Sequence, residues 1–291
     1  MTAEVTNKGL LPLDIACVVV LYNPDEYVNE RLQSYAAFLG DIFVIDNTDH
    51  APFINLSTSK NNLYIEGIGR NDGLGRALNR GIALASLRGY KWVLLLDQDS
   101  NLSKATLVTT LKGIGPQVGI IAPLQITKKR DIRPVGLERG FKEILTTMTS
   151  GSILNISAFQ ECGNFEEKMF IDHIDHEYCL RLKKYGYKIL ECQDAVLNHS
   201  LGEVKHINVC RHKIEFTSHK PFRLYFFFRN GLYVSFLYLN TSPYFIFIFT
   251  KQCVTYLIKA VLFERDKVLR LRMIARGIYD WALGRYGRKY I

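Results

Sequence analysis

Short apolar runs that end abruptly in polar residues are the feature that most constrains how this chain of 291 residues can fold. Ile15–Leu21, Ile42–Ile45 and Trp92–Leu96 are uninterrupted apolar segments of strand length, and Val118–Ala122 is a fourth candidate. Between two of these runs, Leu74–Leu87 repeats its apolar residues at helical spacing. The alternation of strands and helices predicts an α/β fold in which helices flank a mostly parallel central sheet.

The residues that follow these runs predict where a ligand would bind. Tyr22 and Asn23 follow the first run, Asp46 follows the second, and Asp97 and Asp99 follow the third. In open parallel sheets, ligands bind outside the carboxyl ends of the strands. We therefore expect these side chains to border a single ligand cleft.

Asp97 and Asp99 are separated by one residue, so their side chains point to the same side of an extended segment. Two carboxylates at the end of a buried strand are costly unless a partner compensates their charge. Oxygen ligands of this kind suit Mg²⁺ or Mn²⁺, which also keep water or phosphate ligands. The pair therefore predicts a site for a divalent metal.

Three alternatives compete for the same two acids. A calcium loop would need Gly at its sixth position and Glu at its twelfth, where this chain has Leu102 and Val108, so that interpretation is rejected. Phosphatases with an aspartyl nucleophile also place Asp-x-Asp after an apolar strand, but they have Thr or Val where this chain has Asn101. The simplest alternative is a solvated turn in which Asp99 or Ser100 caps the next helix.

A second acidic segment, residues 165–188, contains a candidate for proton transfer. Asp172 and Asp175 would share one face of a helix, and Glu177 and Arg181 are four apart in the orientation that supports a helix. One interpretation makes Asp175 a general base. The other makes Asp172 the N-cap of the helix, with Asp175 in its first turn.

Residues 69–81 form a glycine-rich segment at the expected transition from a strand to a helix. It contains Gly73, Gly75, Asn79 and Gly81, but it matches neither the dinucleotide fingerprint nor the P-loop pattern, which excludes both classical sites. Glycines at a helix start still allow the backbone to approach a ligand closely. The alternative is a helix start in which small residues serve packing.

The charge of the chain is unevenly distributed. Residues 1–199 contain 21 Lys and Arg against 23 Asp and Glu, whereas residues 200–291 contain 16 against 5. The basic C-terminal third predicts an anionic partner: membrane phosphate, nucleic acid or a pyrophosphate-linked substrate.

The six cysteines include no CxxC pair, and the first apolar run is too short for a signal peptide. Both features predict reduced thiols in the cytoplasm.

The C-terminal third is also rich in aromatic residues. Twelve of them lie within Phe222–Phe249, and no apolar run there reaches the roughly 18 residues needed to span a membrane. Further on, Val268, Leu271, Ala275 and Ile278 form one helical stripe surrounded by basic residues. A basic amphipathic helix beside an aromatic segment predicts contact with a membrane surface. The alternative is that the aromatic residues pack onto the sheet domain and the basic residues are solvated.

Seven segments, in this order, resemble the inverting glycosyltransferases of family 2, which have the nucleotide-diphospho-sugar-binding fold called GT-A, and more narrowly their bacterial rhamnosyltransferase subgroup. The segments are VVVLYNP (18–24), VIDNT (44–48), RNDGLGRALNRG (70–81), LLLDQDS (94–100), TSGSILN (149–155), FIDHIDHEYCLRLKKYGYKI (170–189) and LNHSLG (197–202). RLYFFFRNG (223–231) resembles a segment that follows the catalytic domain in this subgroup. Thr48 and Asp72 depart from the family pattern, but neither departure removes a catalytic acid.

The resemblance implies a role for each matched position. Asp175 would be the catalytic base, and Asp97, Asp99 and His199 would hold the metal. The residues that would contact the nucleotide sugar are Tyr22, Asn23, Asp46, Asn71, Gly73, Asn79, Asp97, Gln98, Ser150 and Gly151. The residues that would contact the acceptor or support the site are Asp172, Glu177, Arg181, Arg229 and Asn230.

The resemblance also implies an activity and a location. The donor would be dTDP-β-L-rhamnose, and the acceptor a lipid-linked cell-surface glycan at the inner face of the cytoplasmic membrane. Residues 1–202 would form the GT-A catalytic domain, and residues 203–291 a basic helical extension that touches the membrane or forms a homodimer. The alternatives are a different nucleotide-sugar donor, an aspartyl-nucleophile phosphatase, or a non-enzymatic module that binds anionic surfaces. No signature of specific nucleic-acid recognition is present.

Overall fold

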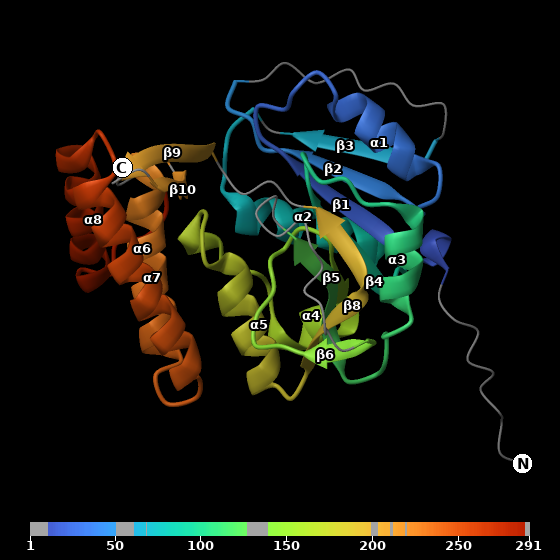
Figure 1. Cartoon of the computed structure of the whole chain (residues 1–291). Coiled ribbons are helices and arrows are strands. Elements are labelled where there is room, and N and C mark those ends of the chain that lie inside the picture. The colour runs from blue at the N-terminus through green and yellow to red at the C-terminus, as the bar shows by residue number, and fades with distance from the viewer. Residues whose placement is uncertain are drawn as a thin grey trace, which may run out of the picture.

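A sheet of eight strands, counted within the described residues, forms the centre of the chain (Figure 1). The structure, a computed structural model, describes residues 11–50, 61–67, 69–126, 139–198, 203–209, 212–218 and 220–288. The strands of this sheet are β1 Ala16–Leu21, β2 Ile42–Asp46, β3 Leu63–Gly67, β4 Trp92–Asp97, β5 Val118–Ile126, β6 Phe141–Glu143, β7 Ser152–Asn155 and β8 Lys188–Asn198. Their order in the sheet is β3-β2-β1-β4-β7-β5-β8-β6.

The sheet is mostly parallel, as the sequence predicted. β7 runs antiparallel to β4 and β5, and β6 runs antiparallel to β8, while the other paired strands are parallel. The four strands expected from apolar runs are present as β1, β2, β4 and β5, and the expected helix Leu74–Leu87 is present with those bounds. β3, β6, β7 and β8 were not predicted.

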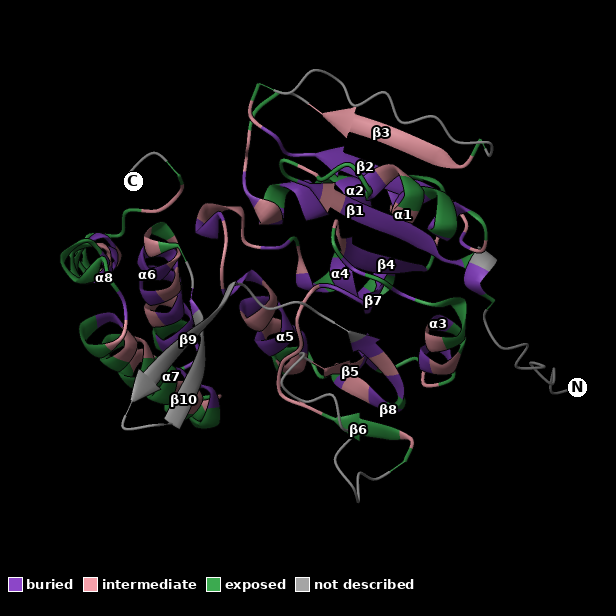
Figure 2. Ribbon diagram, turned by 45° about the horizontal axis from the view of Figure 1, so that its top comes forward, coloured by how far each residue is buried: buried purple, intermediate pink, exposed green. Residues whose placement is uncertain are grey.

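Helices cover both faces of the sheet, which explains why β1, β2 and β4 are apolar on both sides (Figures 1 and 2). The helices that follow or connect these strands are α1 Val28–Ala36, α2 Leu74–Leu87, α3 Lys104–Leu111, α4 Ile156–Cys162 and α5 Ile174–Lys184. One buried cluster joins α1 and α3 to one face. A second cluster joins α2, α4 and α5 to the other face.

The glycine-rich segment has one clear packing role. Gly81 lies on the face of α2 that packs on β1, and a Cβ atom at this position would lie 2.4 Å from Cγ1 of Val18. Only a residue without a side chain allows the helix and the strand to approach this closely.

The C-terminal region begins with a two-stranded sheet, which corrects the expectation of a purely helical extension. Its elements are β9 Glu203–Val209, β10 His212–Ser218, α6 Pro221–Leu237, α7 Pro243–Leu262 and α8 Lys267–Ala282. Val234 of α6, Tyr238 directly after it, and Phe245 and Phe249 of α7 belong to the same buried cluster as α2, α4 and α5. The extension therefore shares its core with the sheet domain.

Helix α8 exposes its apolar stripe and buries a partly polar face (Figure 2). The exposed stripe consists of Val268, Leu271, Ala275 and Ile278. The buried positions are Arg270, Ile274, Gly277 and Asp280. Asp280 accepts a hydrogen bond of 2.8 Å from the hydroxyl of Tyr225, and a Cβ at Gly277 would lie 2.5 Å from the Tyr225 carbonyl oxygen. The small residue Gly277, the polar pair of Asp280 and the buried Ile274 attach α8 to α6, and the exposed apolar stripe does not.

Helix α7 corrects the expectation that no C-terminal segment is long enough to span a membrane. Among the described residues, α7 is the one helix that meets both the length and the mean hydropathy needed to cross a membrane. Its mean hydropathy is high enough even though the helix contains Lys251 and Lys259. Only 17% of its most apolar window is buried.

Gly81→Ala tests the close approach of α2 to β1. We expect the free energy of unfolding to fall by about 1–3 kcal/mol, because the added methyl group overpacks the contact with Val18. A glycine-to-alanine change inside an unobstructed helix stabilises by about 1 kcal/mol, so the expected sign is reversed here. Urea denaturation measures the effect. The control, Ala83→Leu on the exposed side of α2, should change stability by less than about 0.5 kcal/mol. A more stable Gly81→Ala variant would contradict the packing.

Candidate active site

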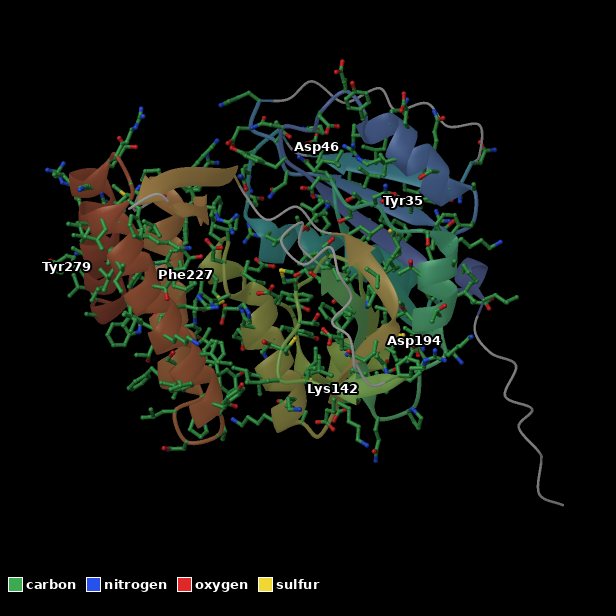
Figure 3. All side chains as sticks on the ribbon, in the orientation of Figure 1. Tyr35, Asp46, Lys142, Asp194, Phe227 and Tyr279 are labelled. Atoms are coloured by element: carbon green, nitrogen blue, oxygen red, sulfur yellow. The ribbon has the colours of Figure 1, made fainter. Side chains whose placement is uncertain are left out.

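The register of the sheet brings three strand ends level with one another. Leu21 pairs with Asp46 across β1 and β2, and Val20 pairs with Asp97 across β1 and β4. Because these strands are parallel, the residues after them emerge at one rim, where Figure 3 marks Asp46. The expectation that Tyr22, Asp46 and Asp97 lie at one edge of the sheet therefore holds.

Hydrogen bonds join the loop after β4 to the loop after β1. The Gln98 side chain accepts from the Tyr22 backbone N–H at 2.7 Å and donates to the Tyr22 carbonyl at 3.1 Å. Arg31 of α1 donates to the Gln98 carbonyl at 2.8 Å. The Asn23 N–H donates to the Thr48 hydroxyl at 2.9 Å, and this bond joins the loop after β1 to the loop after β2. Gln98 thus fixes the loop that carries Tyr22, whose side chain remains exposed.

A second set of hydrogen bonds joins the end of β2 to the glycine-rich segment. The Asn47 amide donates to the Asn71 side chain at 3.0 Å and accepts from the Asp72 N–H at 2.9 Å. The Asn71 side chain also accepts from the Gly73 N–H at 2.9 Å. The Asn71 N–H in turn donates to Asp49 at 2.9 Å. These bonds hold the start of α2 against the rim.

Ser150 and Gly151, predicted from the resemblance to contact the nucleotide sugar, lie beside the end of β4. The Ser150 hydroxyl accepts from the Asp97 N–H at 3.3 Å and forms a hydrogen bond with the Ser100 hydroxyl. Gly151 has a φ of +81°, and a Cβ there would lie 2.5 Å from Cδ2 of Leu197. The conformation and the close approach both require glycine at this position.

The segment before α5 lies directly against the start of α2. The Leu74 N–H donates to the Phe170 carbonyl at 2.7 Å, and a Cβ on Gly73 would lie 2.9 Å from Cα of Phe170. Phe170, Asp172 and His173 have φ values of +68°, +63° and +62°. Three non-glycine residues in the left-handed region are costly, so their surroundings must impose this turn.

Two buried side chains of α6 hold this turn. Asn230 donates to the carbonyls of Met169, Ile171 and Asp172 at 2.8, 2.6 and 3.1 Å. Arg229 donates to the Met169 carbonyl at 2.9 Å. Both side chains are fully buried, so they support the turn and do not reach an acceptor directly.

Asp175 lies in the first turn of α5 and is partly exposed. Its Oδ1 accepts from the His176 N–H at 2.8 Å and lies 3.2 Å from Nδ1 of His176. Burial raises the pKa of Asp175, but His176 outweighs this effect, so the pKa is lowered overall. The carboxyl group is therefore ionised and able to accept a proton. Asp172 instead pairs with Arg223 of α6, and the N-cap of α5 is His173, so Asp172 is not the cap.

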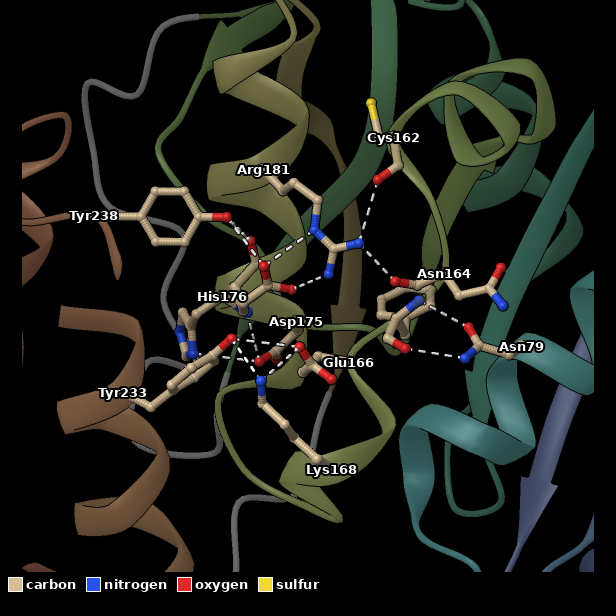
Figure 4. Close-up of polar contacts among 12 residues, drawn as sticks. Asn79, Cys162, Asn164, Glu166, Lys168, Asp175, His176, Arg181, Tyr233 and Tyr238 are labelled. Atoms are coloured by element: carbon tan, nitrogen blue, oxygen red, sulfur yellow. Dashed lines mark hydrogen bonds and ion pairs between the residues drawn. The ribbon is translucent and has the colours of Figure 1, made fainter. Parts of the chain in front are cut away.

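Glu177 and Arg181 form the expected pair on α5 (Figure 4). Arg181 Nε lies 3.0 Å from Glu177 Oε1, and the Tyr238 hydroxyl donates to the same oxygen at 3.0 Å. Arg181 also donates to the Asn164 carbonyl at 2.6 Å. Glu177 is buried, so the pair supports α5 and the contact with α6 and is not placed to bind an acceptor.

Asn79 corrects one expectation. Its amide donates to the Phe165 carbonyl at 3.0 Å, and its oxygen accepts from the Phe165 N–H at 2.8 Å (Figure 4). The amide also donates to Glu167 at 3.1 Å. The side chain is buried and faces the segment before α5. Asn79 therefore joins α2 to that segment and does not contact a nucleotide.

The carboxylates at the end of β4 remain candidates for a metal. Asp97 is half-buried and Asp99 is exposed, which leaves two oxygen-donor groups at a solvent-accessible position. No group of three or more His, Cys, Asp or Glu side chains within the described residues is placed to hold an ion, and His199 lies outside those residues. Two carboxylates fit a cation that takes its other ligands from water and phosphate. The capping alternative is wrong, because Ser103 caps α3.

Sequence reasoning missed several residues of this rim. The rule about strand ends placed Asn47 at the rim without giving it a role, and the same rule could have found Asp49, three residues after β2. Arg31 and Arg223 gave no signal, because their partners are distant in the sequence. Arg288 is 239 positions from its partner Asp49, and only the folded chain reveals the contact.

No protein-family model matches the chain. A curated relative, the dTDP-rhamnosyl transferase RfbF of Shigella flexneri, is 25% identical, over 75% of this chain and 78% of that protein. Among solved structures, S. aureus TarS 1-349 has a TM-score of 0.50 at 12% identity, covering 93% of this chain and 72% of that chain. GalNAc-T7, solved with UDP, GalNAc and Mn²⁺, has a TM-score of 0.56 at 12% identity, covering 95% of this chain and 56% of that chain.

The two structures show the fold, and the curated relative supports the enzyme class that the sequence motifs predicted. The order of the strands, the rim at their carboxyl ends and these similarities agree with one another. The chain is a glycosyltransferase with the GT-A fold, similar to the rhamnosyltransferases of family 2.

Proposed function

We propose that this chain transfers L-rhamnose from dTDP-β-L-rhamnose to a hydroxyl group of a lipid-linked cell-surface glycan. The observation that carries the proposal is a series of hydrogen bonds that links neighbouring segments of the rim in turn. The linked segments are Ser150, Asp97–Gln98, Tyr22–Asn23, Asn47–Thr48 and Asn71. This set gathers five segments at one rim, as a nucleotide sugar requires. The choice of rhamnose rests on the motifs and on the relative from Shigella flexneri.

The nucleoside would bind between the loops after β1 and β2. Tyr22 offers an exposed ring, and Asp46 ends β2 beside the pair of amides formed by Asn47 and Asn71. The diphosphate would then extend toward the end of β4. Gly73 and Gly151, where a side chain would collide with Phe170 or Leu197, keep the backbone on both sides close-packed.

Asp97 and Asp99 would hold Mg²⁺ or Mn²⁺, with His199 as a further predicted ligand. When bound, the ion offsets the negative charge that builds on the departing nucleoside diphosphate. The presence of Mn²⁺ in the solved GalNAc-T7 supports this choice of metal. The hydrogen bond from the Asp97 N–H to Ser150 fixes the backbone that carries the first carboxylate.

Asp175 would act as the general base. Its ionised carboxylate takes the proton from the acceptor hydroxyl, whose oxygen attacks the anomeric carbon of rhamnose from the face opposite the phosphate. The bond to the diphosphate breaks, dTDP leaves, and the configuration inverts from β to α. The turn held by Asn230 and Arg229 fixes the start of α5 and therefore the position of the base.

The apolar stripe of α8 supports a location at the membrane. Val268, Leu271 and Ile278 are exposed, and the exposed side chains of Arg272 and Arg276 lie among them. With 16 basic against 5 acidic residues in the C-terminal third, a second copy of the chain would bring like charges together. An anionic lipid surface complements both the charge and the apolar stripe. We therefore place the enzyme at the inner face of the cytoplasmic membrane, where a lipid-linked acceptor is available.

Asp175→Asn tests the proposed base. Loss of the proton acceptor should reduce the transfer rate by about 10²–10⁴-fold, while the affinity for dTDP stays unchanged. Transfer to a lipid-linked acceptor and equilibrium binding of dTDP measure the two effects. Glu161→Gln on α4, an exposed acid outside the proposed site, is the control and should keep full activity. Full transfer by the Asp175→Asn variant would contradict the assignment.

A panel of nucleotide sugars tests the donor in the same assay. Consumption of dTDP-β-L-rhamnose with formation of an α-linked product is the expected result. Consumption of a different nucleotide sugar alone would change the donor and keep the enzyme class. Phosphate release from simple esters without an acceptor would instead support the phosphatase alternative.

Sedimentation with vesicles tests the membrane surface. Wild-type protein should bind vesicles that contain anionic lipid, and binding should weaken as salt increases. Leu271→Glu combined with Ile278→Glu should lower the bound fraction, because two charges enter the apolar stripe. Leu87→Glu, at an exposed apolar position of α2, is the matched control. Unchanged vesicle binding by the α8 variant would contradict the proposed membrane contact. A wild-type dimer in solution that this variant converts to a monomer would also contradict it.

A further inference from the structure

The chain after α8 returns to the sheet domain. We call residues 283–288 the C-terminal strap. The Gly287 N–H donates to the Lys168 carbonyl at 2.8 Å, and Arg229 donates to the Gly287 carbonyl at 2.9 Å. The ring of Tyr286 lies 5.3 Å from the ring of Tyr233. The strap is therefore fixed to the segment that leads into the turn before α5.

Arg288, at the end of the strap, contacts the rim where the nucleoside would bind. Its two terminal nitrogens lie 2.8 and 2.7 Å from the two carboxylate oxygens of Asp49. One of these nitrogens also lies 3.4 Å from the Asn71 carbonyl oxygen, and the guanidinium lies 5.8 Å from the centre of the Phe170 ring. A single side chain thus links the loop after β2, the glycine-rich segment and the turn before α5.

The pair with Asp49 has a consequence for charge. Asp49 accepts from the Asn71 N–H at 2.9 Å, and the Arg288 guanidinium beside it lowers the pKa of Asp49 to about 2. Without Arg288, this ionised carboxylate would stand uncompensated at a rim that receives a negatively charged diphosphate. Exposed ion pairs contribute about 0–1 kcal/mol to folding, so the pair contributes little to global stability. Its main effect is local.

We propose that Arg288 is a positioning residue for the nucleotide part of the donor, acting through Asp49 and Asn71. The inference rests on the proposed function, because it takes the rim as the donor site. The two-pronged geometry fixes both oxygens of Asp49, which orients the carboxylate toward the Asn71 N–H. Asn71 then presents its side chain to Asn47 and Gly73 in the arrangement described above. The strap thereby completes the donor site from the opposite end of the sequence.

Arg288→Ala tests the proposal by steady-state kinetics and dTDP binding with the full-length enzyme. We expect the KM for the donor and the Kd for dTDP to rise about tenfold, with kcat and the acceptor KM changed less than about twofold. Arg288→Lys keeps the charge and loses the two-pronged geometry, so it should recover only part of the affinity. Arg285→Ala, on the same strap but paired with Asp280, is the matched control and should leave the donor KM unchanged.

Adding Asp49→Asn to Arg288→Ala gives a second test. Removal of the uncompensated charge should restore part of the dTDP affinity, which a purely structural role of Arg288 would not produce. Thermal unfolding of each variant monitors folding. Unchanged dTDP binding by Arg288→Ala, or an equal loss of dTDP affinity in Arg285→Ala, would overturn the inference. In both cases the proposed function would stand as long as the wild type binds dTDP. Absence of dTDP binding by the wild type would instead refute the proposed function.

Discussion

The turn before α5 is the constraint on which the rest of the arrangement depends. It holds Phe170, Asp172 and His173 in the left-handed region, each at a cost of about 1–3 kcal/mol. Asn230 and Arg229 offset this cost with buried hydrogen bonds to its carbonyls. The same turn abuts the start of α2 on one side and starts the helix of Asp175 on the other. The position of Asp175, the proposed base, relative to the rim therefore depends on two residues of α6.

Because α6 holds this turn, the C-terminal third is part of the same folded unit as the sheet domain. A division into a catalytic domain and an extension describes the order of the elements, but Val234, Tyr238, Phe245 and Phe249 share a buried cluster with α5. Removal of the extension would expose that cluster and release the turn. The extension would therefore support the proposed catalysis structurally, and its exposed α8 stripe would serve the proposed membrane contact. The strap would add a third role, at the proposed donor site.

The sequence predicted the parts of the fold that local periodicity determines. β1, β2, β4 and α2 are long apolar or strongly periodic segments, so their pattern was sufficient. β7 has only four residues, and β8 contains charged and polar residues, so neither stands out locally. The rim was predictable because residues after parallel strands share one edge. The positions of Asn79 and Arg288 were not predictable, because each side chain is held by hydrogen bonds to segments distant in the sequence.

Hydrogen–deuterium exchange of the full-length protein with and without dTDP and Mg²⁺ would show whether segments distant in the sequence form one nucleotide-binding rim. We expect dTDP to slow exchange together in residues 22–23, 46–49, 71–74, 97–101 and 149–151, while exchange in α7 and α8 stays unchanged. Protection confined to other segments, or to only one of these five, would contradict it.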